Sequence, residues 1–240
     1  MTDEAGLLEK LADAKRELTA LSDLSDETAR AKKALDAATA AATAAASALT
    51  DTRRAAAERL VPLVSDELAF LDMEKVRFLT DIRPAALSAT GADAVEFLIS
   101  TNPGEEPKPI AKIASGGELA RIMLALKSVF ADSFGVQTVI YDEIDAGVSG
   151  KTARKIGIKL KKSAQGTQTI CVTHSAQIAS LADRQLLIQK QVVGTRTETQ
   201  VAEITGEDRV REIARILGGV TVSETMRSSA RELIDEGKNY

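Results

Sequence analysis

The sequence has one cysteine, Cys171, and no tryptophan among its 240 residues. A single cysteine excludes a disulfide within the chain and fits a reducing cytoplasm. Aromatic residues make up only 3% of the chain, so a platform for stacking nucleic-acid bases is not expected. No apolar run is long enough for a membrane-spanning helix, and the acidic start, residues 1–4, is unlike a signal peptide. We therefore expect a cytoplasmic protein with no membrane partner.

The phosphate-binding pattern Gly-x-x-x-x-Gly-Lys-Ser/Thr is also absent. The nearest match runs from Gly147 to Thr152, but only two residues separate its glycines. A loop that wraps the β-phosphate of a nucleotide needs four residues there. The segment is therefore interpreted as a turn that leads into a helix.

Charged residues make up 28% of the chain and the net charge is −4. These values are typical of a soluble globular protein, and the acidic balance gives no general support for nucleic-acid binding. Two local basic clusters remain candidates, Arg53–Arg54 and the lysines of residues 159–162. A solvated helix face is the more common explanation of such clusters.

The composition changes near residue 70. Before it, the chain is rich in Ala, Leu, Lys and Glu and has no glycine after Gly6. Steps of four and three residues lead from Leu7 to Leu63, and 12 of the 17 positions on this seam are apolar. This heptad pattern predicts a coiled-coil arm over residues 1–70, with a helix break near residues 22–27. A helical bundle within the globular domain is the alternative.

Residues 71–240 have a different period and form the second predicted domain. Short apolar runs alternate with helical patterns, which predicts an α/β fold with a parallel sheet. The strands are expected at 76–79, 94–99, 136–141 and 168–172, with a hairpin over 184–204 centred on Gly194. The helices are expected at about 115–134, 151–163, 175–181, 207–217 and 223–236.

Ser115-Gly116-Gly117-Glu118 stands at the start of the first of these helices. Ser-x-x-Glu is the pattern of a capping box, which needs neither of the glycines. Glycine weakens a helix start, but it lets the backbone approach a ligand closely, and a helix N-terminus attracts anions. The segment predicts a helix cap, to which a phosphate contact can be added.

Asp142 and Glu143 follow the apolar residues 138–141. Ligands of open α/β sheets bind at the carboxyl ends of the strands, so both carboxylates are expected at a site. Adjacent strand residues point to opposite faces, and we therefore expect different roles. One acid can hold Mg²⁺, and the other can orient and deprotonate a water that attacks a phosphate. The alternative is an acidic strand end that enters solvent.

His174 is the only histidine and follows residues 170–173, the end of another predicted strand. At the same sheet edge it could hydrogen-bond a phosphate oxygen or an attacking water. A purely structural histidine is the alternative. Cys171, inside the strand, is expected in the core and not as a nucleophile.

The order of these motifs resembles the C-terminal lobe of an ABC-type ATPase head. The resemblance implies that Asp142 is the Walker B magnesium ligand, Glu143 the catalytic glutamate and His174 the switch histidine. It implies a signature motif, which binds nucleotide in trans, at Ser115, Gly116, Gly117 and Glu118. It also implies a D-loop at Asp145, Ala146 and Gly147.

The helical segment before the lobe narrows this resemblance to the SMC-like ATPases. Within them, residues 114–127, 142–150 and 171–174 are similar to the RecN family of bacterial DNA repair proteins, and residues 211–219 also fit. Residues 175–176 are Ser-Ala, where the family often has Leu-Pro.

The resemblance also implies what lies around this chain. RecN-like proteins carry a Walker A lobe before the coiled coil, so the chain is expected to be a C-terminal half that needs this N-terminal lobe as a partner. ATP and Mg²⁺ are the implied cofactors, acting in a homodimer joined through its heads. DNA is the implied partner of the complete protein, in double-strand break repair on the nucleoid. A non-catalytic bridging module and half of another SMC-like ATPase are the alternatives.

Overall fold

The computed structural model describes residues 4–113, 115–130, 136–193, 196–219 and 222–240. The chain divides into two compact units. The first comprises Met1–Ala56 and Ile82–Val95, and the second comprises Ala57–Asp81 and Glu96–Tyr240. The division predicted from composition, 1–70 and 71–240, stays a prediction. Among the described residues, no helix is both long and apolar enough to span a bilayer.

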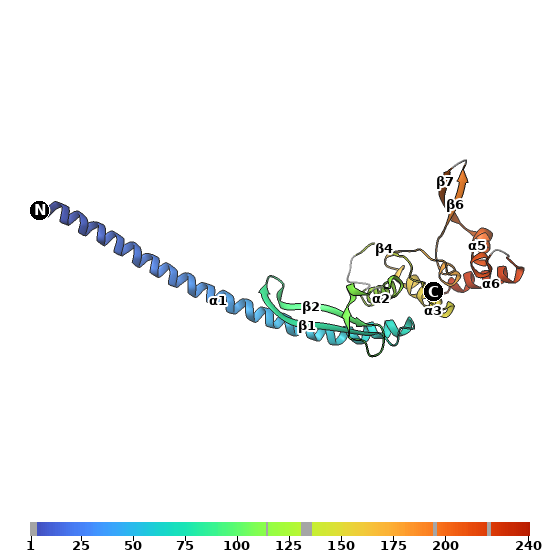
Figure 1. The fold of residues 1–240 in the computed structure, drawn as a ribbon, viewed down its shortest axis with the longest axis horizontal. Coiled ribbons are helices and arrows are strands. Elements are labelled where there is room, and N and C mark those ends of the chain that lie inside the picture. The colour runs from blue at the N-terminus through green and yellow to red at the C-terminus, as the bar shows by residue number, and fades with distance from the viewer. Residues whose placement is uncertain (1–3, 114, 131–135, 194–195, 220–221) are drawn as a thin grey trace. The chain divides into compact units, whose positions relative to one another are not determined.

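The first element, α1, is a single helix from Glu4 to Phe70 (Figure 1). The helix break predicted near residues 22–27 is wrong. Residues of the Ser and Asp type cap a helix only where its backbone begins, and inside a helix their side chains find other partners. Just after this stretch, the Thr28 hydroxyl donates to the carbonyl of Leu24 at 2.7 Å, which satisfies it within the helix.

The apolar seam of α1 is largely exposed in the first unit. Leu18 and Leu21, for example, are 69% and 64% exposed. Further along, the seam position Arg53 contacts the turn between β1 (Arg77–Ser88) and β2 (Gly91–Ser100). There the Asp93 carboxylate accepts from the Thr50 hydroxyl at 2.8 Å and from the Arg53 guanidinium at 3.1 Å. Within this unit, the β1–β2 turn therefore covers part of the predicted coiled-coil seam.

The second unit contains the remaining helices and strands. Strands β1, β2 and β3 form one sheet in that order, and β3 (Lys108–Pro109) pairs antiparallel with the part of β2 that lies in this unit. The chain continues through a short 3₁₀ helix, η1 (Ile110–Lys112), to α2 (Gly116–Val129), β4 (Thr138–Tyr141), α3 (Gly150–Ser163), β5 (Gln168–Cys171) and α4 (Ala176–Ala179). It ends with β6 (Gln185–Val193), β7 (Arg196–Ile204), α5 (Gly206–Gly218) and α6 (Glu224–Gly237).

Strands β4 and β5 pair in parallel, with Tyr141 opposite Cys171, as the α/β prediction requires. One face of the pair, together with α2, α3 and the end of α1, surrounds a core that includes Leu68, Ile122 and Ile156. On the other face, Ile140 is 67% exposed and its partner Ile170 is 41% exposed. The α/β class is thus confirmed, with one side of the parallel pair uncovered in this chain.

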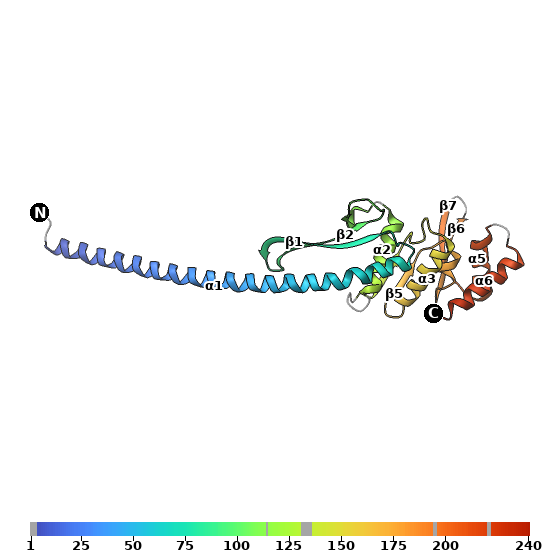
Figure 2. The same ribbon diagram turned by 90° about the horizontal axis from the view of Figure 1, so that it is seen from below.

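The remaining expectations for the second unit fit with small shifts. Helix α2 ends at Val129, since the Phe130 N–H closes its last turn on Leu126. The rest of the helix expected to reach residue 134 lies outside the described residues. Strands β6 and β7 form the predicted antiparallel hairpin, although Gly194 itself is outside the description. Helices α5 and α6 lie side by side (Figure 2) and share a small core that includes Ile213 and Ala230.

Candidate functional site

The N-terminus of α2 is capped as the Ser-x-x-Glu pattern predicts. Ser115 has an extended backbone, and its hydroxyl oxygen accepts the N–H of Glu118 at 3.4 Å. The side chain of Glu118 lies in the first turn, where a negative charge is favourable. The helix start is therefore fixed by its own residues, without a ligand.

The two glycines next to this cap bring the helix against the loop after β4 in the same chain. A Cβ atom on Gly116 would lie 3.1 Å from the Glu143 carboxylate, Oε2. A Cβ on Gly117 would lie 3.1 Å from the Ala146 Cβ and 3.2 Å from the Glu143 carbonyl oxygen. Close packing within the chain is thus one reason for glycine here, and it places Gly116 and Gly117 beside Glu143.

Asp142 and Glu143 are both exposed, and they occupy the turn that follows β4. The strand ends at Tyr141, so the expectation that pleating separates the two carboxylates is wrong. They are separated instead by the left-handed backbone of Glu143, with φ of 55°. This conformation is uncommon for a residue with a side chain, and such strain concentrates at functional sites. The Asp142 carboxylate accepts the N–H of Glu143 at 3.0 Å, which fixes its orientation.

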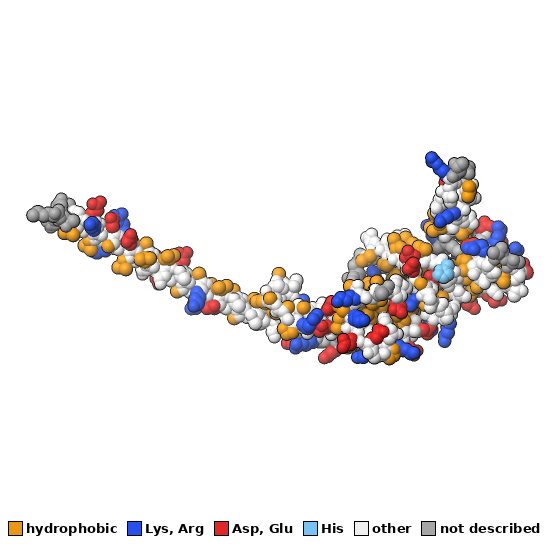
Figure 3. Space-filling view, in the orientation of Figure 1, with side chains coloured by type: hydrophobic (Ala, Val, Ile, Leu, Met, Phe, Trp, Pro, Cys, Tyr) orange, Lys and Arg blue, Asp and Glu red, His pale blue; other side chains and the backbone are white. Residues whose placement is uncertain are grey.

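Asp145 joins this turn to the end of β5. Its carboxylate is buried and accepts the backbone N–H of His174 at 3.1 Å and the hydroxyl proton of Thr173. The Thr173 oxygen in turn accepts the N–H of Ser175 at 3.0 Å. The His174 side chain is 84% exposed (pale blue in Figure 3), with its Nδ1 3.5 Å from Asp145. The two strand ends predicted to meet do meet, through Asp145.

Arg121 is a residue of this site that the motif analysis did not single out. It lies one turn after Gly117 on the buried face of α2, and its guanidinium donates to the carbonyls of Ile144 at 3.4 Å and Ala146 at 3.1 Å. Burial lowers the pKa of Arg121, while the charge of Glu118 opposes that shift. The sequence feature that could have identified Arg121 is a positive charge on the apolar side of an amphipathic helix, because a buried charge needs polar partners.

Cys171 is half-buried and packs against the core, so its predicted structural role is supported. Burial, and then the negative charges of Asp145 and Asp142, raise the pKa of its thiol to about 12. Burial also raises the pKa of Tyr141, its partner on β4, to about 12. Neither group supplies an anion or nucleophile near neutral pH.

The basic clusters considered for DNA have acidic partners in this chain. Arg53 pairs with Asp93 at 3.1 Å, and Lys159 pairs with Glu67 at 2.5 Å. Lys161 forms an ion pair with Asp183. Such pairing gives these three residues a structural role within the chain.

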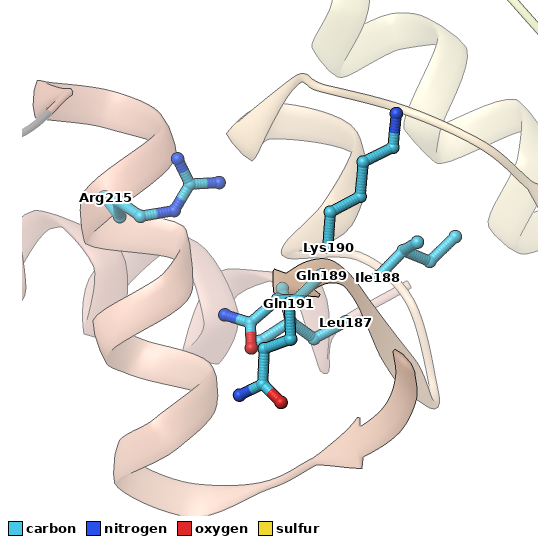
Figure 4. Close-up of a pocket in the computed structure, with 6 residues that line it drawn as sticks. All are labelled: Leu187, Ile188, Gln189, Lys190, Gln191 and Arg215. Atoms are coloured by element: carbon cyan, nitrogen blue, oxygen red, sulfur yellow. The ribbon is translucent and has the colours of Figure 1, made fainter. Parts of the chain in front are cut away.

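Among the candidate site residues, Asp142, Glu143 and His174 are exposed, whereas Gly117 and Asp145 are buried. A hollow among the described residues lies elsewhere, beside β6, and its lining residues are labelled in Figure 4. It is formed by residues 187–191 and Arg215, and none of the motif residues lines it. No group of three or more His, Cys, Asp or Glu side chains suited to a metal occurs in the described part of the chain. A cation at Asp142 would therefore need ligands from water or substrate.

The fold and the site together define a class of protein. A long helix leads into an α/β lobe in which a capped Gly-Gly helix start, an Asp-Glu turn and a strand ending in His are brought together. This arrangement resembles the C-terminal lobe of an SMC-like, ABC-type ATPase head. Among solved structures, the Smc head domain of Pyrococcus furiosus with an extended coiled coil, bound to the C-terminal domain of ScpA, aligns with 67% of this chain at 19% identity and a TM-score of 0.46, and 38% of that chain is covered.

Curated sequences identify the particular family. The DNA repair protein RecN of Halalkalibacterium halodurans is 43% identical over 194 residues, which are 79% of this chain and 34% of that protein. RecN of Bacillus subtilis is 35% identical over 246 residues, covering 96% of this chain and 43% of that protein. No family model matches the chain. The chain belongs to the RecN family, and it spans less than half the length of these relatives.

Proposed function

We propose that this chain forms the C-terminal part of the ATPase head of a RecN-type protein that acts in DNA double-strand break repair. Residues 71–240 are the lobe and residues 1–70 the coiled-coil arm. The observation that carries the proposal is the cluster around the loop 142–147. Gly116 lies against Glu143, and Asp145 holds the backbone of His174 at 3.1 Å.

The proposed roles follow from the chemistry of this cluster. Glu143 orients and deprotonates the attacking water, and His174 donates a hydrogen bond to the γ-phosphate or to that water. Asp142 is oriented by the N–H of Glu143 and has an exposed carboxylate, which fits a Mg²⁺ ion that keeps several waters. Bound Mg²⁺ would neutralise phosphate charge.

The nucleotide itself needs residues that this sequence lacks. With no phosphate-binding loop in the sequence, we propose that an N-terminal Walker A lobe supplies it. Parallel sheets are found with both faces covered, and the face of β4–β5 that carries Ile140 and Ile170 is open here. That lobe is the proposed cover of this face.

A second head completes the site in this proposal. Ser115, Gly116, Gly117 and Glu118 of one head would contact the nucleotide held by the other, and Asp145, Ala146 and Gly147 would lie near the same junction. The exposed leucines of α1 support a coiled coil with another helix, since an isolated apolar seam is unfavourable in water. ATP would join the heads, and hydrolysis would separate them.

The test is the substitution Glu143→Gln in the complete protein. The amide keeps the size of the side chain but cannot accept a proton, so turnover should fall by at least about a hundredfold while ATP binding is retained. The matched control is Glu198→Gln, which changes an exposed acid on β7, outside the proposed site. Hydrolysis at the normal rate by Glu143→Gln would contradict the role.

A non-catalytic bridging module is the second candidate, favoured by the missing phosphate-binding loop. Calorimetry with ATP and this chain alone addresses it. Under our proposal the chain by itself binds little or no ATP, but it gains binding when the N-terminal lobe is added. A chain that forms a complex with that lobe and still binds no ATP would favour the bridging module.

A further inference from the structure

Asp72, just after the end of α1, has a backbone conformation that is unusual for a residue with a side chain. Two described residues other than glycine have a positive φ, Glu143 and Asp72, and the latter has φ of 59°. The Asp72 N–H donates to the Ala69 carbonyl at 3.0 Å, and the Met73 N–H donates to the Leu68 carbonyl at 2.9 Å. These are the two bonds of a Schellman motif, in which the left-handed position is usually glycine. Ending the helix therefore does not explain why this position is an aspartate and not a glycine.

The side chain of Asp72 supplies that reason, because it reaches the first turns of α3. Its carboxylate accepts the hydroxyl of Thr152 at 2.7 Å and the ammonium of Lys155 at 2.6 Å. The hydrogen bond from Lys155 is the largest cause of the lowered pKa of Asp72. The carboxylate therefore binds one helix end to one helix start.

The contact continues into the cap of α3. The only hydroxyl proton of Thr152 is donated to Asp72, so the Ser149 hydroxyl must be the donor in the 3.0 Å contact between Ser149 and Thr152. The Thr152 N–H donates back to the Ser149 oxygen at 3.3 Å. A carboxylate at the end of such a chain polarises each hydrogen bond in it. Asp72 thus fixes Ser149, the residue that begins α3.

Ser149 is also the last residue of the loop that begins at Asp145. Asp145 holds one end of this loop through Thr173 and His174. Ser149 holds the other end through Thr152, whose hydroxyl donates to Asp72. Between them, Gly147 has φ of 70°, and a Cβ built there would have no neighbour within 4 Å. The carbonyl of Ala146 accepts from Arg121 at 3.1 Å and Val148 packs against the core, so the loop is held along its length and a change at one anchor is passed to the other.

We propose that Asp72 is a positioning residue that links the end of α1 to the loop 145–149 and, through Asp145, sets the placement of His174. Its consequence for hydrolysis rests on the proposed function. The link itself does not, because every contact in it lies within the second unit and none involves a nucleotide.

The chain offers a matched control one turn earlier on α1. Glu67 also pairs with α3, through Lys159 at 2.5 Å, and both lysines lie over the Phe70 ring at 5.5 Å for Lys155 and 5.0 Å for Lys159. The Glu67 pair therefore joins the same two helices, but it meets α3 far from Ser149. Removing it weakens the helix contact and leaves the cap intact.

The experiment compares Asp72→Asn, Asp72→Gly and Glu67→Gln in this chain without nucleotide. Asn and Gly both tolerate the left-handed backbone, so the two Asp72 variants should fold. Native-state hydrogen exchange is measured at the amides of Thr152 and His174, together with the imidazole NMR signals of His174, the only histidine.

The expected result is about fivefold faster exchange at both amides and shifted imidazole signals in both Asp72 variants, within the range for a partly exposed charged contact. Glu67→Gln should leave both readouts at His174 unchanged. The proposal is overturned if the His174 readouts are unchanged in the Asp72 variants, or if Glu67→Gln alters them equally. If the Asp72 variants give the expected changes at His174 but the complete protein does not hydrolyse ATP, the result would contradict the proposed function and leave the Asp72 link intact.

Discussion

The carboxylate of Asp145 accepts the backbone N–H of His174 at 3.1 Å while the imidazole of that histidine stays exposed. Substitution by Ala would leave the part-buried hydroxyl of Thr173 and N–H of His174 without their acceptor. We expect Asp145→Ala to lower the free energy of unfolding by about 1–3 kcal/mol. Urea unfolding with an unchanged m-value measures this. Asp142→Ala, at an exposed carboxylate, is the control and should change stability by less than about 0.5 kcal/mol.

Gly116 and Gly117 should differ in their tolerance of a methyl group. On Gly117 it meets the backbone carbonyls of Glu143 and Ala146 at 3.2 and 3.3 Å, which cannot move alone. On Gly116 it meets only the flexible end of Glu143. Gly117→Ala should therefore destabilise the chain by about 1–3 kcal/mol, and Gly116→Ala by less.

Gly150→Ala is the reference for these variants. The nearest atom to its added Cβ lies at an ordinary 3.5 Å, and alanine favours a helix start over glycine. Its stability should be unchanged or higher by up to about 1 kcal/mol. Equal losses in all three variants, measured by urea unfolding, would contradict the close approach of α2 to the loop.

The thiol of Cys171 should react slowly in the folded chain. Its pKa is raised from 9.0 to about 12, which reduces the thiolate at pH 8 by roughly a hundredfold to a thousandfold. Iodoacetamide labelling, followed by mass spectrometry, should be slow in buffer and fast in urea. Equal rates in the two conditions would show that this strand is open to solvent.

Stability should fall in acid because Asp72 and Asp93 both have lowered pKa values. The lysine and threonine partners of Asp72 hold its pKa below the ordinary 3.8, and Thr50 and Arg53 act on Asp93 in the same way. A depressed folded-state pKa contributes stability above the unfolded value, and this contribution is lost as the pH falls below about 4. Urea midpoints between pH 7 and pH 3 measure the loss, which should be smaller in Asp72→Asn.

Much of the lobe could be predicted because its local patterns agree with its packing. The alternation of apolar strands and amphipathic helices led to the correct elements, and Ser115 caps α2 as its spacing with Glu118 indicates. A wrong prediction arose where Ser and Asp residues can either cap a helix or lie inside one. Residues 22–27, where a helix break was predicted, lie inside a continuous helix. A short stretch of sequence does not show whether the helix continues through such residues.

The least predictable contacts join residues far apart in the chain. Nothing near Asp72 indicates that its carboxylate will meet Thr152, and nothing near Arg121 indicates the carbonyls of the loop after β4. The left-handed backbone of Glu143 could likewise not be predicted, because the sequence Asp-Glu does not specify the backbone conformation of either residue. Such features depend on tertiary packing and have no local period.

At position 143, the residue that best suits the left-handed backbone differs from the residue that the proposed reaction requires. Glycine there would remove about 1–2 kcal/mol of steric strain, so a library selected only for folding should enrich glycine at residue 143. A library selected for turnover should reject it and retain glutamate, if the proposed base is correct. Residue 143 would then mark a trade-off between stability and function that sequence enrichment alone can measure.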